Sequence, residues 1–206
     1  MLNAVSYWLV MLRSAKSLIL EDYYGSNDMY VPSRNYLAPW SATPLEILEK
    51  MLELAKIQTG EVLCDICCGD GRFLVAGSGI YGIRSIGYEQ DGRLAEVSKR
   101  NIAANGLDHL ATVIRGDVFN FRDFGTDVDL TDADVVVLYL ITGGMQTVRD
   151  RLAPHFKKRA RIVSHHYPFE GVKPRLVRSL YSPKYDLRRR ILVYYAEDLK
   201  QPTDKS

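Results

Sequence analysis

The chain has 206 residues, enough for one domain with a sizeable core, and its 47% apolar and 25% charged content is typical of a soluble globular protein. A formal net charge of +2 excludes a strong field of one sign over the whole molecule. Residues 149–190 nevertheless hold thirteen lysines and arginines against three acids, whereas residues 108–134 hold seven aspartates against two bases. Two solvated faces of opposite charge are the simplest interpretation, and a basic surface for an acidic partner such as nucleic acid is the alternative.

The first 42 residues precede the part of the chain that reads as a domain. No acid occurs before Glu21, and Arg13 and Lys16 interrupt the apolar segment too early for a stable membrane helix. A secretory signal would carry its charges before the apolar run, not after it. We expect residues 1–42 to form a helical and irregular extension on the domain, with an organelle transit peptide as the alternative.

From Thr43 onward the sequence predicts alternating helices and strands. The first helix is expected to have Thr43 as its N-cap, Pro44 in its first turn and Glu46 closing a capping box, and to end at Gly60. Later helices are predicted at residues 72–76, 91–105 and 145–155. Strands are predicted at residues 61–66, 85–89, 112–117, 134–140 and 161–167, followed by an antiparallel pair at 174–182 and 190–197.

This alternation predicts an α/β fold for residues 43–200, followed by a short tail at 201–206. We expect a Rossmann-like sheet of seven strands, mostly parallel, with a terminal antiparallel hairpin and helices on both faces. Ligands of such sheets bind at the carboxyl ends of the strands, so the residues that follow each strand are the candidates for function.

The three cysteines of the chain, Cys64, Cys67 and Cys68, lie in one short stretch and cannot join distant parts of the fold. This favours a reducing, intracellular compartment, for which we expect the cytoplasm, with the mitochondrion as the alternative. A zinc site needs about four ligands. The histidines lie at no recognisable metal spacing, so no metal is predicted.

A glycine loop follows the first strand and opens the next helix. Its sequence is Asp65-Ile66-Cys67-Cys68-Gly69-Asp70-Gly71, and we call residues 65–71 the glycine loop. Gly69 and Gly71 would let the main chain approach a ligand where a side chain would clash. By itself this loop indicates a nucleotide-like ligand or merely a tight turn.

Two further acids end the next two strands. Glu89, on the second strand, can accept hydrogen bonds from ribose hydroxyls, and Asp117, after the third, can accept one from an exocyclic amino group. Together with Asp65 and Asp70 these carboxylates would repel a pyrophosphate, but they suit a cationic sulfonium nucleoside without phosphate. Independent turn or cap residues are the alternative explanation.

The glycine loop, the acid on the second strand and the Gly116-Asp117 pair resemble the class I S-adenosylmethionine-dependent methyltransferases over residues 43–167. The resemblance implies an S-adenosylmethionine site. It implies that Asp65, Gly69 and Gly71 surround the methionine portion, that Glu89 holds the ribose, and that Asp117 and Val118 lie at the adenine. Cys67 stands where the family motif has its first glycine and narrows this site.

Flanking motifs resemble a narrower group, the small archaeal protein-lysine methyltransferases and the mitochondrial lysine methyltransferases that modify the ATP synthase c subunit and the adenine nucleotide translocase. The matching segments are residues 40–44, 51–56, 68–72 and 162–165. The resemblance implies N-methylation of a lysine in a protein substrate, with Thr43 near the carboxylate of the cofactor. The sequence has Ser41-Ala42 where those proteins favour Val-Pro.

In such a reaction a neutral amine attacks the methyl group of the sulfonium in line, and proximity and alignment supply most of the catalysis. A lysine with a pKa of about 10.4 must first lose a proton. Residues Leu138 to Ile141 end the fourth strand, where substrate should meet cofactor, and Tyr139 is expected to shape the acceptor channel. His165 or His166 would bind the amine or relay its proton. A structural role is the alternative for each of these three side chains.

Three other functions remain open at this point. Nucleic-acid methylation is favoured by the basic residues 149–190, but residues 138–141 lack the Pro-Pro-Tyr type motif of amino-directed adenine enzymes. Methylation of a small molecule fits less well with a short chain without a large inserted lid. A non-catalytic cofactor-binding module is the third alternative, for which Cys67 is the main support. The sequence leaves the oligomeric state open.

Overall fold

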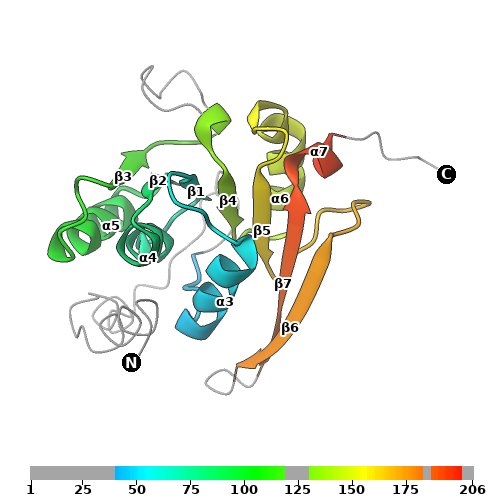
Figure 1. Cartoon of the computed structure of the whole chain (residues 1–206), viewed down its shortest axis with the longest axis horizontal. Helices are drawn as coiled ribbons and strands as arrows, with labels where there is room; N and C mark the ends of the chain where they lie inside the picture. The colour runs from blue at the N-terminus through cyan, green and yellow to red at the C-terminus, as the bar shows by residue number, and fades with distance from the viewer. Residues whose placement is uncertain (1–39, 119–129, 183–186, 201–206) are drawn as a thin grey trace.

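The computed structural model describes residues 40–118, 130–182 and 187–200 (Figure 1). The expectations for residues 1–39 and for the tail at 201–206 concern parts of the chain outside this range. Within the described residues, no helix is both long enough and apolar enough to cross a membrane.

Seven strands form one sheet in the order β3-β2-β1-β4-β5-β7-β6. The strands are β1 (Val62–Ile66), β2 (Arg84–Glu89), β3 (Ala111–Arg115), β4 (Val135–Leu138), β5 (Arg161–His165), β6 (Leu176–Ser182) and β7 (Leu187–Tyr195). Neighbouring strands from β3 through β5 pair in parallel, whereas β7 runs antiparallel to both β5 and β6. The predicted Rossmann-like α/β fold with its terminal hairpin is confirmed.

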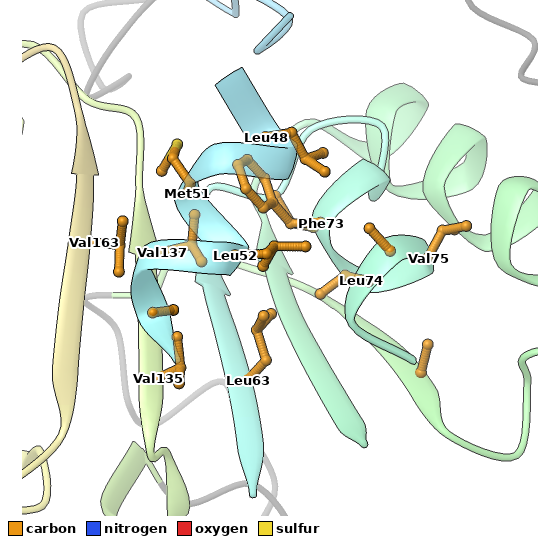
Figure 2. Close-up of a cluster of buried hydrophobic side chains, with 14 of the residues drawn as sticks. Leu48, Met51, Leu52, Leu63, Phe73, Leu74, Val75, Val135, Val137 and Val163 are labelled. Carbon is orange, nitrogen blue, oxygen red and sulfur yellow. The ribbon is translucent and has the colours of Figure 1, made fainter. Parts of the chain in front are cut away.

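Helices cover both faces of this sheet. One face carries α3 (Leu45–Ala55), α4 (Arg72–Tyr81) and α5 (Gly92–Ala104), and the other carries α6 (Thr142–Arg151) and α7 (Ala196–Leu199). Successive side chains of β4 point to opposite faces of the sheet, and helices cover both faces, which explains why every residue of this strand is apolar. Val135 and Val137 enter the core under α3 and α4, as Figure 2 shows, whereas Val136 and Leu138 enter the core under α6.

The first helix differs from its prediction at both ends. It begins at Leu45 with Pro44 as its N-cap, and the Thr43 hydroxyl instead lies 3.3 Å from Nδ1 of His165. It ends at Ala55 rather than at Gly60, because Lys56 adopts the left-handed conformation with φ of 51° and its N–H closes the last turn on Glu53. Thr43 is therefore free of the helix and belongs to the segment that leads into it.

The other boundaries differ by a few residues. The helix α4 continues past the predicted end at residue 76 to Tyr81, where Gly82 adopts the left-handed conformation with φ of 64° and donates its N–H to the main-chain oxygen of Ser78. Gly77 lies inside the helix, where an added Cβ would meet Ser85 Oγ at 2.8 Å. The helix α6 begins at Thr142 and ends before Pro154, after which residues 153–155 form a 3-10 turn. The strand β7 begins at Leu187, three residues before its predicted start at 190, and α7 was not predicted.

Candidate active site

A cleft lies at the carboxyl ends of β1 to β4, which is where the sequence places the candidate residues. Its volume is about 840 Å³ with its open mouth included, within the usual range for a small-molecule site. The predicted residues that line it are Thr43, Asp65, Cys67, Gly69, Glu89, Asp117, Val118 and Tyr139. The predicted residues Gly71, Leu138 and His165 lie behind this lining, and all three are buried.

The two glycines of the glycine loop have different surroundings, although both have positive φ, 55° at Gly69 and 77° at Gly71. A Cβ at Gly69 would meet Trp40 Nε1 at 2.3 Å, so this glycine admits the indole at the wall of the cleft. A Cβ at Gly71 would meet Ser98 Oγ at 2.0 Å and Ser98 Cα at 3.3 Å. Gly71 therefore allows α4 and α5 to approach one another.

Glu89 connects the glycine loop to the start of α5. The main-chain N–H of Gly69 donates to Glu89 Oε2 and that of Asp91 donates to Glu89 Oε1, each at 2.8 Å. Asp91 in turn caps α5 by accepting from the N–H groups of Arg93 and Leu94. Because each carboxylate oxygen can accept more than one hydrogen bond, Glu89 holds the loop and still has lone pairs for a ligand in the cleft.

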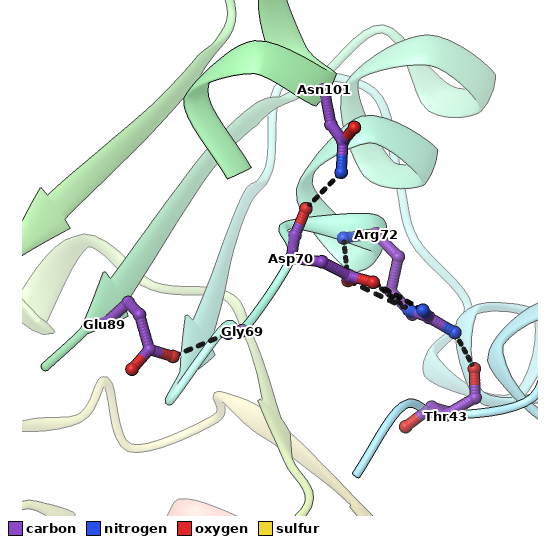
Figure 3. A network of polar contacts seen from close by, with 6 residues as sticks. All are labelled: Thr43, Gly69, Asp70, Arg72, Glu89 and Asn101. Carbon is purple, nitrogen blue, oxygen red and sulfur yellow. Dashed lines mark hydrogen bonds and ion pairs between the residues drawn. The ribbon is translucent and has the colours of Figure 1, made fainter. Parts of the chain in front are cut away.

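A buried ion pair stands at the opposite end of the loop (Figure 3). The guanidinium of Arg72 contacts both carboxylate oxygens of Asp70 and also donates to the main-chain oxygen of Thr43. Asn101 Nδ2 donates to the main-chain oxygen of Asp70 at 2.8 Å. Asp70 is therefore neutralised by Arg72, so its charge contributes less to the cleft than the sequence suggested.

Asp65 and Glu89 remain as buried acids at the floor of the cleft. Burial, with the neighbouring carboxylates of Asp70 and Glu89, raises the pKa of Asp65 well above its usual range, although Arg72 opposes this shift. Burial also raises the pKa of Glu89, although hydrogen bonds from the main-chain N–H groups of Asp91, Gly69 and Gln90 oppose this shift. A cation bound between these acids would favour their ionised forms.

Tyr139 forms the wall of the cleft that follows β4, and two side chains hold it. The ring of His165 lies 3.9 Å from the ring of Tyr139, centroid to centroid, and Arg189 Nη1 donates to Tyr139 Oη at 3.2 Å. His165 is fully buried, and this burial, with Arg189 and His166 nearby, lowers its pKa to about 3. His165 is therefore neutral at physiological pH and a weak base. In this geometry it can influence the reaction by packing against Tyr139.

Cys67 adopts the left-handed conformation with φ of 66° at the position of the first motif glycine. Its side chain is accessible from the cleft, and desolvation followed by the nearby carboxylates of Glu89, Asp65 and Asp117 raises the pKa of its thiol. Cys64 and Cys68 are buried, and all three thiols are free. Among the described residues, no group of three or more histidines, cysteines or acids is arranged to hold a metal.

The sequence of the chain matches a known family across these elements. A family model described as the ANTKMT methyltransferase domain matches residues 65–176, which is just over half of the chain. The chain belongs to this family. The ANTKMT methyltransferase match begins at Asp65 in the glycine loop and ends at the first residue of β6, so it includes β2 to β5 and most of the cleft.

Individual relatives of this ANTKMT family member are more distant. A protein-lysine N-methyltransferase of Saccharolobus islandicus (strain REY15A) is 28% identical over 149 residues, covering 72% of this chain and 86% of that protein. A tRNA (guanine(10)-N2)-dimethyltransferase of Methanocaldococcus jannaschii is 28% identical over 117 residues, covering 56% of this chain and 32% of that protein.

Among solved structures, an RNA methyltransferase of Salinibacter ruber in complex with S-adenosyl-L-homocysteine is similar, with a TM-score of 0.70 and 26% identity. The similarity covers 81% of this chain and 99% of that one. Together with the family match, it confirms the predicted class: the chain is a class I S-adenosylmethionine-dependent methyltransferase.

Sequence reasoning missed several cleft residues of this methyltransferase, above all Trp40 and Arg72. Arg72 had a signal, because a cation in the first turn of a helix opposes the helix dipole and needs a specific partner. Trp40 lies next to Gly69 only through the tertiary fold, and no local pattern in the sequence indicates that contact.

Proposed function

We propose that this protein transfers a methyl group from S-adenosylmethionine to the side-chain amine of a lysine in a protein. The observation that supports it best is that Tyr139, held by Arg189 and His165, lines the same cleft as the buried acids Asp65 and Glu89. The cleft thus has an acidic part that suits a cationic cofactor and a tyrosine hydroxyl that suits an incoming amine. The Saccharolobus islandicus relative, named as a protein-lysine N-methyltransferase, supports the choice of lysine.

The residues of the cleft fit S-adenosylmethionine in charge and in hydrogen bonding. We assign Asp65, Cys67 and Gly69 to its methionine portion, Glu89 to its ribose, and Asp117 with Val118 to its adenine. Thr43 lines the cleft and is assigned to the carboxylate of the cofactor, and Arg72, which is paired with Asp70, holds the main chain of Thr43 in place. Gly71 and Leu138 lie behind the side chains that line the cleft. Gly71 would shape the glycine loop, and Leu138 would shape the floor of the cleft. When bound, S-adenosylmethionine supplies an electrophilic methyl group on a positively charged sulfur.

The chain's own side chains orient the acceptor and favour its neutral form. Tyr139 Oη accepts a hydrogen bond from Arg189 and keeps a lone pair that can accept an N–H of the amine. The guanidinium of Arg189 beside this position disfavours a second positive charge, so it lowers the pKa of an arriving lysine. His165 fixes the tyrosine ring by stacking, and because it is neutral it adds no further charge.

The experiment is transfer of labelled methyl from S-adenosylmethionine to cell extract, followed by hydrolysis and amino-acid analysis. We expect label in methylated lysine. Label found only in RNA or in small molecules would contradict the assignment to lysine. Asp65→Ala should abolish cofactor binding in calorimetry, whereas the exposed Asp108→Ala should leave it intact. Undiminished binding by Asp65→Ala would refute the proposed pocket, and cofactor binding by the unmodified protein without any methyl transfer would favour a non-catalytic cofactor-binding module.

RNA methylation is the second candidate, and a specific observation supports it. The Salinibacter ruber RNA methyltransferase is similar along 99% of its own length, and a tRNA dimethyltransferase is among the relatives. Adding ribonuclease before the labelling reaction separates the two functions. Loss of the label after ribonuclease treatment would support RNA, and its persistence in protein supports lysine.

For the site of action we propose the cytoplasm. The three thiols are free and lie close together in sequence, which suits a reducing compartment. The comparisons give no support to the mitochondrial alternative. Fractionation of cells that produce the tagged full chain tests this proposal, and enrichment in an organelle would contradict it.

A further inference from the structure

The hairpin of β6 and β7 extends past the carboxyl end of β5. The pairing of β5 with β7 runs from Arg161 opposite Tyr195 to His165 opposite Ile191, whereas β7 begins at Leu187. Residues 187–190 therefore lie beyond β5, at the edge of the sheet where the cleft opens, and Ser179–Ser182 of β6 pair with them. Figure 1 shows both strands continuing past β5. We call residues 177–181 and 188–190, the part of the hairpin at and beyond this end of β5, the overhang.

Two arginines attach the overhang to the acceptor end of the cleft. Arg189 Nη1 donates to Tyr139 Oη at 3.2 Å. The N–H of His166 donates to the main-chain oxygen of Arg190 at 2.7 Å, and Arg190 Nη2 donates to the main-chain oxygen of His166 at 3.1 Å. The overhang is thus continuous with the wall that presents Tyr139, and a molecule bound there would lie next to the position of the methyl acceptor.

The outer face of the overhang combines apolar and positively charged side chains. Val177, Ser179 and Tyr181 point to one face of β6, with Arg190 opposite Ser179 and Arg188 opposite Tyr181. Val177 is 51% exposed and Tyr181 is 55% exposed. The other strongly exposed large apolar side chain of the described residues, Ile141 at 42%, directly follows the cleft residue Leu140. Exposed apolar side chains therefore lie both on the hairpin, at Val177 and Tyr181, and next to the cleft, at Ile141.

The distance from the hairpin to the cleft suits a segment of extended polypeptide. β6, β7, β5 and β4 are successive neighbours in the sheet, so β6 lies roughly 14 Å from β4 at the usual strand spacing. About four residues of extended chain cover that distance. A segment that crosses these strands toward β4 runs roughly perpendicular to them, so it would contact their side chains rather than pair with the outer edge of β6.

The positive charge of the overhang favours a segment that carries acidic side chains. Within residues 40–118, 130–182 and 187–200, neither Arg178 nor Arg188 forms an ion pair with an acid. We propose that the overhang binds an extended, acidic segment of the protein substrate and so presents its lysine to Tyr139. Carboxylates of that segment would contact Arg188, and an apolar side chain would pack on Val177 and Tyr181, which lie on the same face of the hairpin. This inference rests on the proposed lysine methylation.

The test uses a peptide library with one fixed lysine and degenerate flanks, methylated by the full chain with labelled S-adenosylmethionine. We expect aspartate and glutamate to be enriched about three to five residues from the lysine in the methylated fraction. For a selected acidic peptide, Arg188→Glu should raise KM about tenfold and leave kcat nearly unchanged. Arg159→Glu is the same charge reversal at an exposed residue just before the amino end of β5, the end remote from the cleft, and should change neither constant. Thermal melting and cofactor binding verify that both variants are folded.

Several results would overturn the inference while leaving lysine methylation intact. These are methylated peptides without acidic preference, or equal KM values for Arg188→Glu and Arg159→Glu. If polyuridylate competes with the peptide and Arg188→Glu removes only this competition, the overhang is a nucleic-acid site instead. Labelling of no lysine in the library contradicts the proposed function itself, and is thereby distinguishable from failure at the overhang.

Discussion

Arg72 ties the glycine loop to the segment that precedes α3, because its guanidinium donates a hydrogen bond to the main-chain oxygen of Thr43 while it pairs with Asp70. Both partners of the ion pair are buried. One side chain thus fixes two walls of the cleft that lie far apart in sequence. The cleft is expected to depend on this contact both for its shape and for its stability.

We predict that Arg72→Ala destabilises the fold by about 3–5 kcal/mol, since it leaves the Asp70 carboxylate buried without a partner. Urea unfolding measures this loss. Asp70→Asn combined with Arg72→Met should be less destabilised than Arg72→Ala alone, because no buried charge remains. A double variant as unstable as the single one would show that the tie to Thr43, and not the ion pair, carries the effect.

Tyr139→Phe removes only the hydroxyl that Arg189 contacts and keeps the ring that packs on His165. We expect kcat for methyl transfer to fall by about tenfold to a hundredfold, because the amine loses its acceptor and its alignment. The affinity for S-adenosylmethionine should stay nearly constant in calorimetry. Tyr81→Phe, which removes the same atom at the end of α4, is the control. Equal kcat values for the two variants would exclude a role of Tyr139 in transfer.

His165 should make the protein less stable in mild acid. Its pKa is about 3 in the fold, against an ordinary value of about 6.5, so the unfolded state binds more protons between these limits. The stability contributed by neutral His165 is complete above about pH 6.5 and is lost as the pH falls, by up to about 1.4 kcal/mol for each pH unit.

The comparison is with His165→Asn, in urea unfolding at about pH 7.5 and about pH 5. The variant should lose less stability on acidification than the unmodified protein. Asp65 and Glu89, whose pKa values are raised, act in the opposite direction, but both proteins contain them and their effect cancels in the difference. Parallel pH profiles would mean that His165 is not held neutral by the fold.

Cys67→Gly is predicted to stabilise the protein by about 0.5–1 kcal/mol. A non-glycine residue at φ of 66° costs about 1–2 kcal/mol, and the greater freedom of unfolded glycine offsets part of the gain. Cys67→Ala keeps the penalty and serves as the matched control in thermal melting. Because glycine also widens the cleft, S-adenosylmethionine should bind Cys67→Gly at least as tightly. If Ala and Gly have equal effects, the backbone at this position is not strained.

Much of this fold follows from local sequence patterns. The apolar run of β4, the capped helix after Asp91 and the acids at the ends of β1 and β2 each depend on residues close in sequence, and each appears where expected. Asp117, which follows β3, likewise lines the cleft as expected. These positions are set by burial, capping and turn geometry, which act over a few residues.

The missed features depend on contacts between distant segments. The N-cap prediction for Thr43 was wrong because the helix begins one residue later, while the Thr43 side chain lies against His165, 122 residues away. The early start of β7 was missed because Arg188–Arg190 look like a solvated basic run until β6 is placed beside them. Only the assembled sheet shows that these arginines reach the edge of the cleft.

The row of arginines on the terminal hairpin has one more consequence. β6 is the outermost strand of the sheet, and such a strand is a template on which a second copy of the same chain could assemble. Two copies that paired edge to edge along β6 would bring Arg178 of one molecule close to Arg178 of the other, and like charges repel at that distance. The same positive charge that we propose to bind an acidic segment is therefore expected to disfavour this edge-to-edge pairing of two copies.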